Sequence, residues 1–469
     1  MLYFSQIIKI IIVIFCLCSS PFLFLIKNQK TVISSDIRRD NSTPHASSPD
    51  FTIGPENNLY LVFVEFSKEK RQIVFLQANS DFEWNLTKKY LKELDTLETT
   101  LTSPSITIIN GGIYVVFIET THEKSSLIIL QRDGNNRWST FENITSFTHT
   151  FSYPTMLSYQ DLLQVSWVSN GRNEGNSSLN YKKYNLTSQS WGSKKIVREI
   201  VDYSCLWPSV AFDKDGNCHY AWSEGEENYE KILHLKVLKN DTKTSISRLT
   251  SGDNRCSKSA ICVENDGTVN VFWNNITNQN SDLKGANSIY YRKKLPLSWS
   301  NIAKVAPYIS PLQPGGADAF DPTVTLTNQQ ILWLGYEYHQ DYLQEQGVAI
   351  RPRRNNNWEP SERVTTVRNT PKDLVINADQ NGNIHCIWLD FRSQMSYEVY
   401  YRVRETTSYW SEEIKLTDFG GDPNKYGGLI TVVIVGLIAL SLPIAIYVII
   451  RNRKRQKIID QKKKELIDE

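Results

Sequence analysis

Acidic residues recur at the ends of similar apolar segments along the chain. They are Glu65, Glu119, Glu224, Glu337 and Asp390, and they close runs such as LYLVFVE and IHCIWLD. If these runs are equivalent strands of one repeated sheet, their carboxylates gather on one face of the molecule. Carboxylate oxygens bind hard cations and accept hydrogen bonds from hydroxyl-rich ligands. In a second interpretation, each carboxylate only accepts hydrogen bonds from the adjoining loop of its own repeat.

Other chemistries find little support in the residue pattern. The histidines are scattered and form no HExxH or Ser/His/Asp signature, and no glycine-rich loop is placed to hold a phosphate. No C-x-x-C pair predicts a zinc site. The formal net charge of +2 on 469 residues leaves no basic footprint for nucleic acid. We therefore expect no cofactor, no metal and no nucleic-acid partner.

Cysteines and glycosylation motifs are both present. Cys205 and Cys256 hold nearly equivalent places in consecutive repeats, so a disulfide between them is a candidate. The motif N-x-S/T, which accepts N-linked glycans on surface loops, occurs seven times. The acceptor residues are Asn41, Asn85, Asn143, Asn176, Asn185, Asn240 and Asn275.

Apart from Asn41, these residues lie within a repeat of about fifty residues that runs through residues 50–419. Each copy contains a short apolar strand, a tight turn, an apolar and aromatic strand, an alternating strand and a fourth strand. The copies start at Asp50, Pro104, Pro154, Pro208, Lys258, Pro322 and Pro371, with Asp50 replacing the opening proline. Four strands make one antiparallel blade, and stacking blades around an axis buries their faces. The sequence predicts an all-β, seven-bladed β-propeller.

A tryptophan opens the fourth strand in six of the seven copies, and we expect these side chains to be mostly buried between or within blades. They are Trp84, Trp138, Trp191, Trp299, Trp358 and Trp410. The segment QRDGNNRWS, from Gln131 to Ser139, adds an aspartate and a glycine to the tryptophan in the turn before the strand. With these turns, the repeats resemble the bacterial neuraminidase, or Asp-box, repeats of sialidase-like propellers. In that family the turns are structural and lie opposite the active site.

The resemblance implies which residues this chain would need in order to act as a sialidase. A sialidase holds the substrate carboxylate with three arginines and uses a tyrosine nucleophile paired with glutamate. The family's first arginine lies in an R-I-P or R-L-P motif, which this chain lacks; its Arg-Pro pair is Arg351-Pro352, in the sixth copy. The last copy contains Arg392, Arg402 and Arg404. We attribute them to the alternating pattern that is common in strands of such repeats, not to a substrate site. We therefore assign no catalytic residues.

Apolar segments flank the repeats. Residues 1–30 are predicted to be a signal peptide or an uncleaved signal anchor, followed by a linker at 31–49. Residues 429–450 are uncharged and long enough to span a hydrocarbon core of roughly 30 Å. They follow a linker at 420–428 and precede a basic tail at 451–469, which should remain cytoplasmic. This pattern predicts a single-pass plasma-membrane protein with an extracellular propeller.

The leading function from sequence is a membrane-anchored propeller that binds glycan or protein ligands without catalysis. The alternatives are a membrane-tethered glycoside hydrolase of sialidase type and a structural component of the surface coat. An enzyme should bring arginines and carboxylates together at one mouth of the ring, whereas a binder should show aromatic and amide groups there.

Overall fold

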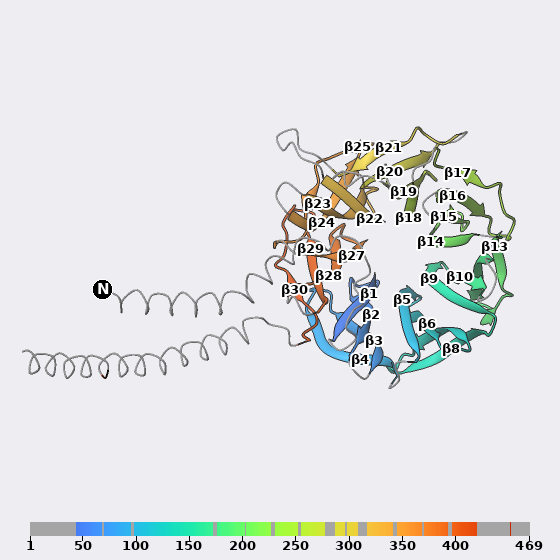
Figure 1. Ribbon diagram of the computed structural model, residues 1–469, viewed down its shortest axis with the longest axis horizontal. Coiled ribbons are helices and arrows are strands. Elements are labelled where there is room, and N and C mark those ends of the chain that lie inside the picture. The colour runs from blue at the N-terminus through green and yellow to red at the C-terminus, as the bar shows by residue number, and fades with distance from the viewer. Residues whose placement is uncertain are drawn as a thin grey trace, which may run out of the picture. The chain divides into compact units, whose positions relative to one another are not determined.

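The computed structural model describes residues 44–419 and Arg451, apart from short segments at 68–69, 95–97, 172–175, 202, 227–229, 252–254, 277–286, 296–297, 308–316, 341–344, 368–369 and 393–395. The described chain forms seven antiparallel sheets arranged as blades around an axis (Figure 1). The prediction of an all-β, seven-bladed propeller is confirmed.

Each blade is built from consecutive strands. Blade one contains β1 (His45–Ile53), β2 (Leu59–Phe66), β3 (Arg71–Ala78) and β4 (Trp84–Leu94). Blade two contains β5 (Thr100–Ile109), β6 (Gly112–Thr120), β7 (Ser125–Arg132) and β8 (Trp138–Ser146). Blade three contains β9 (His149–Tyr159), β10 (Leu162–Gly171), β11 (Ser177–Asn185), β12 (Ser190–Trp191) and β13 (Lys195–Ile200). Blade four contains β14 (Ser204–Phe212), β15 (Cys218–Gly225), β16 (Lys231–Val237) and β17 (Ser247–Arg248).

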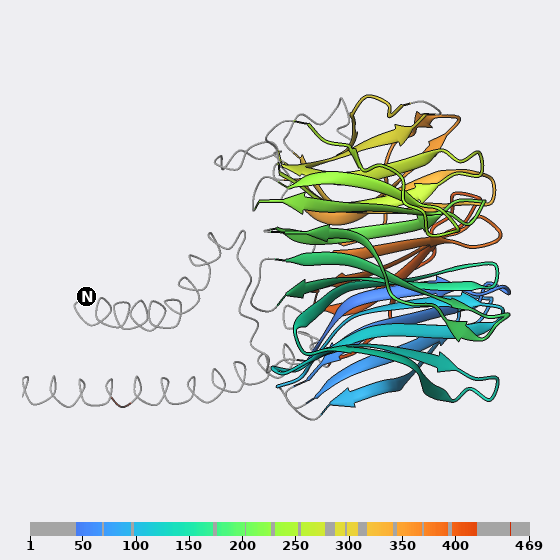
Figure 2. The ribbon, with the colours of Figure 1, turned by 90° about the vertical axis from the view of Figure 1, so that its right-hand side faces the viewer.

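The other three blades repeat this plan. Blade five contains β18 (Arg255–Val263), β19 (Val269–Ile276), β20 (Asn287–Lys294) and β21 (Ala303–Ala306). Blade six contains β22 (Ala317–Leu326), β23 (Leu332–Gln340), β24 (Glu345–Arg354), β25 (Asn357–Trp358) and β26 (Glu362–Arg363). Blade seven contains β27 (Lys372–Ala378), β28 (Ile384–Asp390), β29 (Glu398–Arg404) and β30 (Ile414–Lys415). The first strand of each blade lies nearest the axis (Figure 1), and Figure 2 shows the blades from the side.

The core lies between neighbouring blades. The second strands are largely apolar because both of their faces pack against other sheets. All seven residues of β28, for example, are buried. Tryptophans on the second strands of five successive blades are also buried, namely Trp167, Trp222, Trp273, Trp333 and Trp388.

The fourth-strand tryptophans are mostly but not fully buried, which agrees with the expectation from the sequence. Each indole lies at the interface with the preceding blade. Trp138 meets Phe75 of blade one with ring centroids 5.2 Å apart, and Trp358 meets Tyr291 of blade five at 5.6 Å.

A bulge interrupts each first strand near its start. Register shifts in the first two blades fall between Ser47 and Asp50 and between Thr102 and Ser105. A residue with positive φ lies in every such bulge, although none of the seven is glycine. The residue after it is proline in five blades, and in blade one that proline is Pro49. The predicted starts are therefore corrected, because the first strand begins at His45 and Asp50 does not replace the opening proline. Likewise, Leu374, not Pro371, occupies the proline position of blade seven.

Among the described strands, none is shared between the first and last blades, so side chains and a few hydrogen bonds close the ring. Apolar residues of β1–β3 and β28–β29 form one buried cluster. The Ala46 amide donates to the Tyr397 carbonyl at 2.9 Å, and Trp84 meets Tyr401 with ring centroids 5.2 Å apart. We call this blade-one to blade-seven contact the seam.

The predicted signal, linkers, membrane span and tail fall mainly outside the described residues, as does Asn41. No helix in the described part of the chain is long and apolar enough to cross a membrane.

All five described cysteines are free thiols, so the proposed Cys205–Cys256 disulfide is not formed. Cys205 packs in the cluster between blades three and four, whereas Cys256 packs in the cluster between blades four and five. The sheet of blade four therefore separates the two sulfur atoms.

Candidate functional site

The positive-φ residues of the seven bulges form what we call the axial ring. It contains one residue from the innermost strand of each blade, at equivalent register positions. The members are Ser48, Ser103, Tyr153, Trp207, Lys258, Asp321 and Asp373, with φ between 46° and 53°. A left-handed backbone is costly for residues other than glycine and is enriched at functional sites. The repetition shows that the bulge belongs to the scaffold, while the side chains vary.

Blades five to seven contribute the charged part of the axial ring. The Lys258 ammonium forms an ion pair with the Asp321 carboxylate across the blade interface. Asn274 of β19 holds Asp321 from a second side. Its Oδ1 accepts from the Asp321 backbone N–H at 3.0 Å, and its Nδ2 donates to Asp321 Oδ1 at 3.2 Å.

Glu337 of β23 connects Asp321 to Asp373. Its Oε1 accepts from the Asp373 backbone N–H at 2.6 Å. One carboxylate oxygen from each of the three residues lies within 4.8 Å of the others. Among the described residues, no donor reaches the Asp373 carboxylate. The group could coordinate a cation or accept hydrogen bonds from hydroxyls, although the nearby Lys258 ammonium weakens the case for a metal.

Burial and like charge shape the electrostatics of this group. Burial raises the pKa of Glu337 well above its usual value, and repulsion from Asp321 and Asp373 raises it further. Burial alone would lower the pKa of Lys258, but the three carboxylates raise it on balance. A protonated Glu337 can donate a hydrogen bond as well as accept one.

Aromatic residues continue the axial ring beside the charges. Tyr153 and Trp207 are half-buried, and their ring centroids lie 6.3 Å apart across the interface of blades three and four. Burial raises the pKa of Tyr153, while the positive charge of Lys258 partly offsets that effect. The axial ring therefore runs from two aromatic groups to an ammonium and then to carboxylates.

Glu337 differs in register from the other predicted carboxylates. In blade one, Glu65 pairs with Ala46, which lies two residues before the left-handed residue of the bulge. The equivalent pair in blade six is Tyr338 with Ala319. Tyr338 therefore holds the position that Glu65 holds in blade one. Glu337 is one residue earlier. A shift of one residue along a strand moves a side chain to the opposite face, so Glu337 faces Asp373 of the following blade.

The other four predicted carboxylates form ion pairs within the propeller. Glu65 contacts Lys88 at 2.7 Å, Glu119 contacts Lys92 at 2.9 Å, Glu224 contacts Arg198 at 2.7 Å and Asp390 contacts Arg392 at 2.8 Å. The pairs of Glu65 and Asp390 lie within one blade, whereas Glu119 and Glu224 each pair with a residue of the preceding blade. All four carboxylates remain unassigned to a ligand.

The arginines discussed for a sialidase also have internal partners. Arg402 donates from Nε to the Ser411 carbonyl at 2.7 Å and from NH1 to the Val364 carbonyl at 2.6 Å. Arg351 makes the same pair of contacts in blade six, with Glu359 and Val305. Arg404 contacts Glu362 at 2.6 Å. These guanidinium groups tie outer segments to the third strands.

The glycosylation candidates fall into two classes. Five of the six described acceptors are exposed: Asn85, Asn143, Asn176, Asn185 and Asn240. Asn275 is 7% exposed, and its Oδ1 accepts from the Cys256 thiol at 3.3 Å. Asn275 is therefore unsuitable as an acceptor in the folded protein, because its motif lies on a buried second strand.

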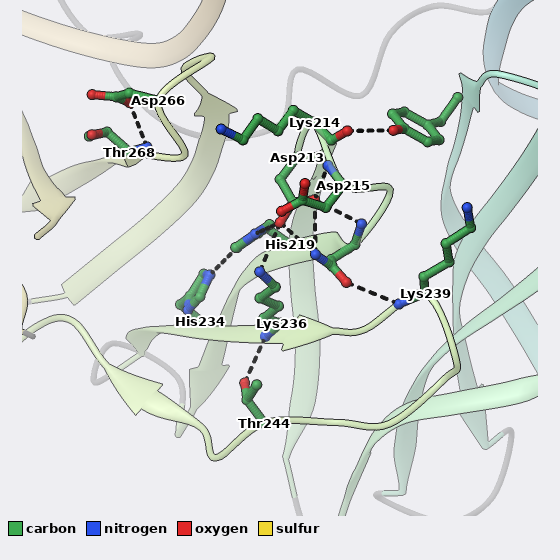
Figure 3. A network of polar contacts seen from close by, with 12 residues as sticks. Asp213, Lys214, Asp215, His219, His234, Lys236, Lys239, Thr244, Asp266 and Thr268 are labelled. Carbon is green, nitrogen blue, oxygen red and sulfur yellow. Dashed lines mark hydrogen bonds and ion pairs between the residues drawn. The ribbon is translucent and has the colours of Figure 1, made fainter. Parts of the chain in front are cut away.

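A second polar group lies inside blade four (Figure 3). His219 contacts Asp213 at 3.3 Å through Nε2 and His234 at 3.1 Å through Nδ1, and Lys236 contacts Asp213 at 2.8 Å. Burial lowers the pKa of His219 to about 4, although Asp213 opposes the shift. The imidazoles are buried, so this network links β15 and β16 and offers no exposed group to a ligand.

Sequence reasoning did not single out Tyr153, Trp207, Asp321 or Asp373. A signal was present, because three of them directly precede the opening proline of a copy, as in Tyr-Pro, Trp-Pro and Asp-Pro. Asp373 occupies the same position without the proline. These four residues could be recognised as one ring only after the structure showed that each lies in the bulge of a first strand.

Comparisons with known proteins bear on the fold alone. No family model and no curated protein matches the sequence. Among solved structures, the GH93 α-L-arabinofuranosidase of Fusarium graminearum with arabinobiose is similar, with a TM-score of 0.42, 10% identity, and 62% of this chain and 88% of that chain covered. The microbial sialidase Hz136 has a TM-score of 0.39 and 10% identity, covering 65% and 66%. The β-propeller domain of the Trilobed protease from Pyrococcus furiosus has a TM-score of 0.46 and 10% identity, covering 81% and 97%.

Proposed function

We propose that the protein is a membrane-anchored cell-surface propeller that binds a hydroxyl-rich glycan at the axial ring without cleaving it. The observation that supports this most directly is the arrangement of aromatic and charged groups around the axis. Tyr153 and Trp207 offer faces for the apolar side of a sugar ring, because aromatic side chains combine large contact areas with defined geometry. Asp321 and Asp373 accept hydrogen bonds from hydroxyls, and Lys258 donates them.

The same arrangement favours a neutral glycan over an anionic one. Carboxylate ligands are held best by bidentate arginine, and no arginine occupies the axial ring. The carboxylates of Asp321 and Asp373 would repel a sialic acid. We therefore expect neutral glycans to bind and sialosides to bind weakly.

Binding can be tested with purified full-length protein on immobilised neutral and sialylated glycans. Trp207→Ala and Asp321→Asn should each reduce binding at least tenfold. Glu119→Gln is the matched control, since Glu119 pairs with Lys92 away from the axial ring. Equal loss in all three variants would point to a folding defect, and unchanged binding in the two ring variants would refute the proposed site.

A glycoside hydrolase remains the second candidate, and the raised pKa of Glu337 favours it. Retaining glycosidases place an acid and a nucleophilic carboxylate roughly 5 Å apart, and Glu337 and Asp373 approach that spacing. Release of reducing sugar from neutral oligosaccharides would reveal turnover. If Glu337→Gln and Asp373→Asn abolished that turnover while glycan binding persisted, the hydrolase would replace the binder.

A further inference from the structure

Four of the five exposed glycosylation motifs share a side-chain geometry. In each, the acceptor amide oxygen receives a hydrogen bond from the threonine two residues later. The backbone N–H groups of Thr87, Thr187 and Thr242 donate to Asn85, Asn185 and Asn240 at 3.0, 2.9 and 3.1 Å. Thr145 Oγ1 donates to Asn143 at 3.1 Å.

This contact occupies the amide oxygen and leaves the nitrogen accessible. Among the described residues, no partner receives a hydrogen bond from Nδ2 of these four asparagines. All four side chains are exposed. Asn176 is not one of these four; in its motif, the Ser178 hydroxyl contacts the Asn180 side-chain amide.

The four motifs also share a location. Asn85 and Asn143 lie on the outer strands β4 and β8, Asn185 ends β11, and Asn240 follows β16. They therefore lie on the outer parts of blades one to four. In blades five to seven the sequence contains the motif at Asn275 alone, where the side chain is buried. The charged part of the axial ring comes from those same three blades.

We propose that Asn85, Asn143, Asn185 and Asn240 carry N-linked glycans on the outer rim of blades one to four, and that blades five to seven remain bare. The inference rests on the cell-surface placement proposed above. The donor is a polyprenyl-diphosphate-linked sugar. Asparagine Nδ2 forms a bond to the anomeric carbon, the bond from that carbon to the diphosphate oxygen breaks, the diphosphate leaves with the electron pair, and the amide proton passes to a base.

Glycopeptide mass spectrometry of the full-length protein isolated from its own cells tests the pattern. Glycans are expected at the four asparagines and none at Asn275, because a sugar there cannot fit inside the folded blade. Thr242→Ala should remove the glycan at Asn240, whereas Thr242→Ser, which preserves the motif, should retain it. Unmodified peptides at all four positions, or a glycan at Asn275 in folded protein, would overturn the proposal.

The glycan-binding assay separates this inference from the proposed function. Protein made without glycosylation should still bind immobilised neutral glycans, because the axial ring contains none of the modified residues. If that protein binds but the native protein has no glycans, only the modification is refuted. If the native protein is modified but binds no glycan, only the ligand is refuted.

Discussion

At the scale of single residues, Glu337 is a carboxyl group held where ionisation is unfavourable. A carboxyl whose pKa is raised by folding contributes most to stability below its unfolded pKa, near 4.5, and that contribution is lost as the pH rises through the folded pKa. Glu337→Gln keeps the oxygen that accepts from Asp373 but cannot ionise. We expect it to increase the free energy of unfolding at pH 7 by on the order of 1 kcal/mol, measured by urea denaturation.

The pH dependence provides the control for this prediction. At pH 4 both proteins have a neutral group at position 337, so their stabilities should converge. Glu119→Gln, which removes an ion pair with Lys92, should not increase stability at pH 7. A Glu337→Gln protein less stable than the parent at pH 7 would show that the carboxylate is stabilised by its surroundings.

At the scale of elements, the fourth-strand tryptophans couple each blade to the one before it. Trp358 lies against Phe272 and Tyr291 of blade five and under the guanidinium of Arg351. Trp358→Ala should cost about 3 kcal/mol, the lower end of the range for large aromatic residues, because the indole is half-buried. Trp358→Phe keeps an aromatic contact and should cost about half as much. A urea midpoint unchanged in the alanine variant would contradict the coupling.

The histidine pair in blade four predicts a second element-scale effect. A histidine whose pKa is lowered by folding stabilises the protein above its unfolded pKa of 6.5, and that stability is lost as the pH falls through the folded value of about 4. Protonation of His219 would also place charge beside His234 and Lys236, with Asp213 offsetting part of it. The expected loss by pH 4 is about 3 kcal/mol.

Melting temperatures between pH 7 and pH 4 check this effect. His219→Gln cannot be protonated and should flatten the profile in that range, while the exposed His122→Gln should leave it unchanged. If the melting temperatures of the parent and of His219→Gln fell in parallel as the pH is lowered, a group other than His219 would be responsible for the acid sensitivity.

At the scale of the whole propeller, the seam is the one blade interface that no connection crosses within the described part of the chain. Its contacts include the Asn377 side chain, which donates to the Phe51 carbonyl at 2.7 Å, and the edge-to-face contact of Trp84 with Tyr401. Opening there breaks packing without stretching a loop. Hydrogen–deuterium exchange should therefore be faster in β1 and β27 than in β14 and β18, and Trp84→Ala should widen the difference. Equal exchange in the four strands would mean that the ring opens as one unit.

The blade count was predictable because each copy carries a complete four-strand pattern with its own turn and aromatic residues. The apolar second strand and the turn residues are local signals, and repetition made them unambiguous. The bulges were not predictable in this way. Five of the seven left-handed residues precede a proline, but the side chains themselves carry no such mark. Three predicted copy starts, at Asp50, Lys258 and Pro371, therefore missed the position after the left-handed residue.

Local sequence therefore determined which residues form strands and how many blades they make, since hydrophobic periodicity and turn chemistry act over a few neighbours. It also identified the glycosylation motifs. Only the tertiary structure decided which side chains meet. Register turned Glu337 away from the other repeated carboxylates, blade four came between Cys205 and Cys256, and Lys258, Asp321 and Asp373 converged from three blades. These outcomes depend on bulges and on packing between blades, where a shift of one residue reverses the direction of a side chain.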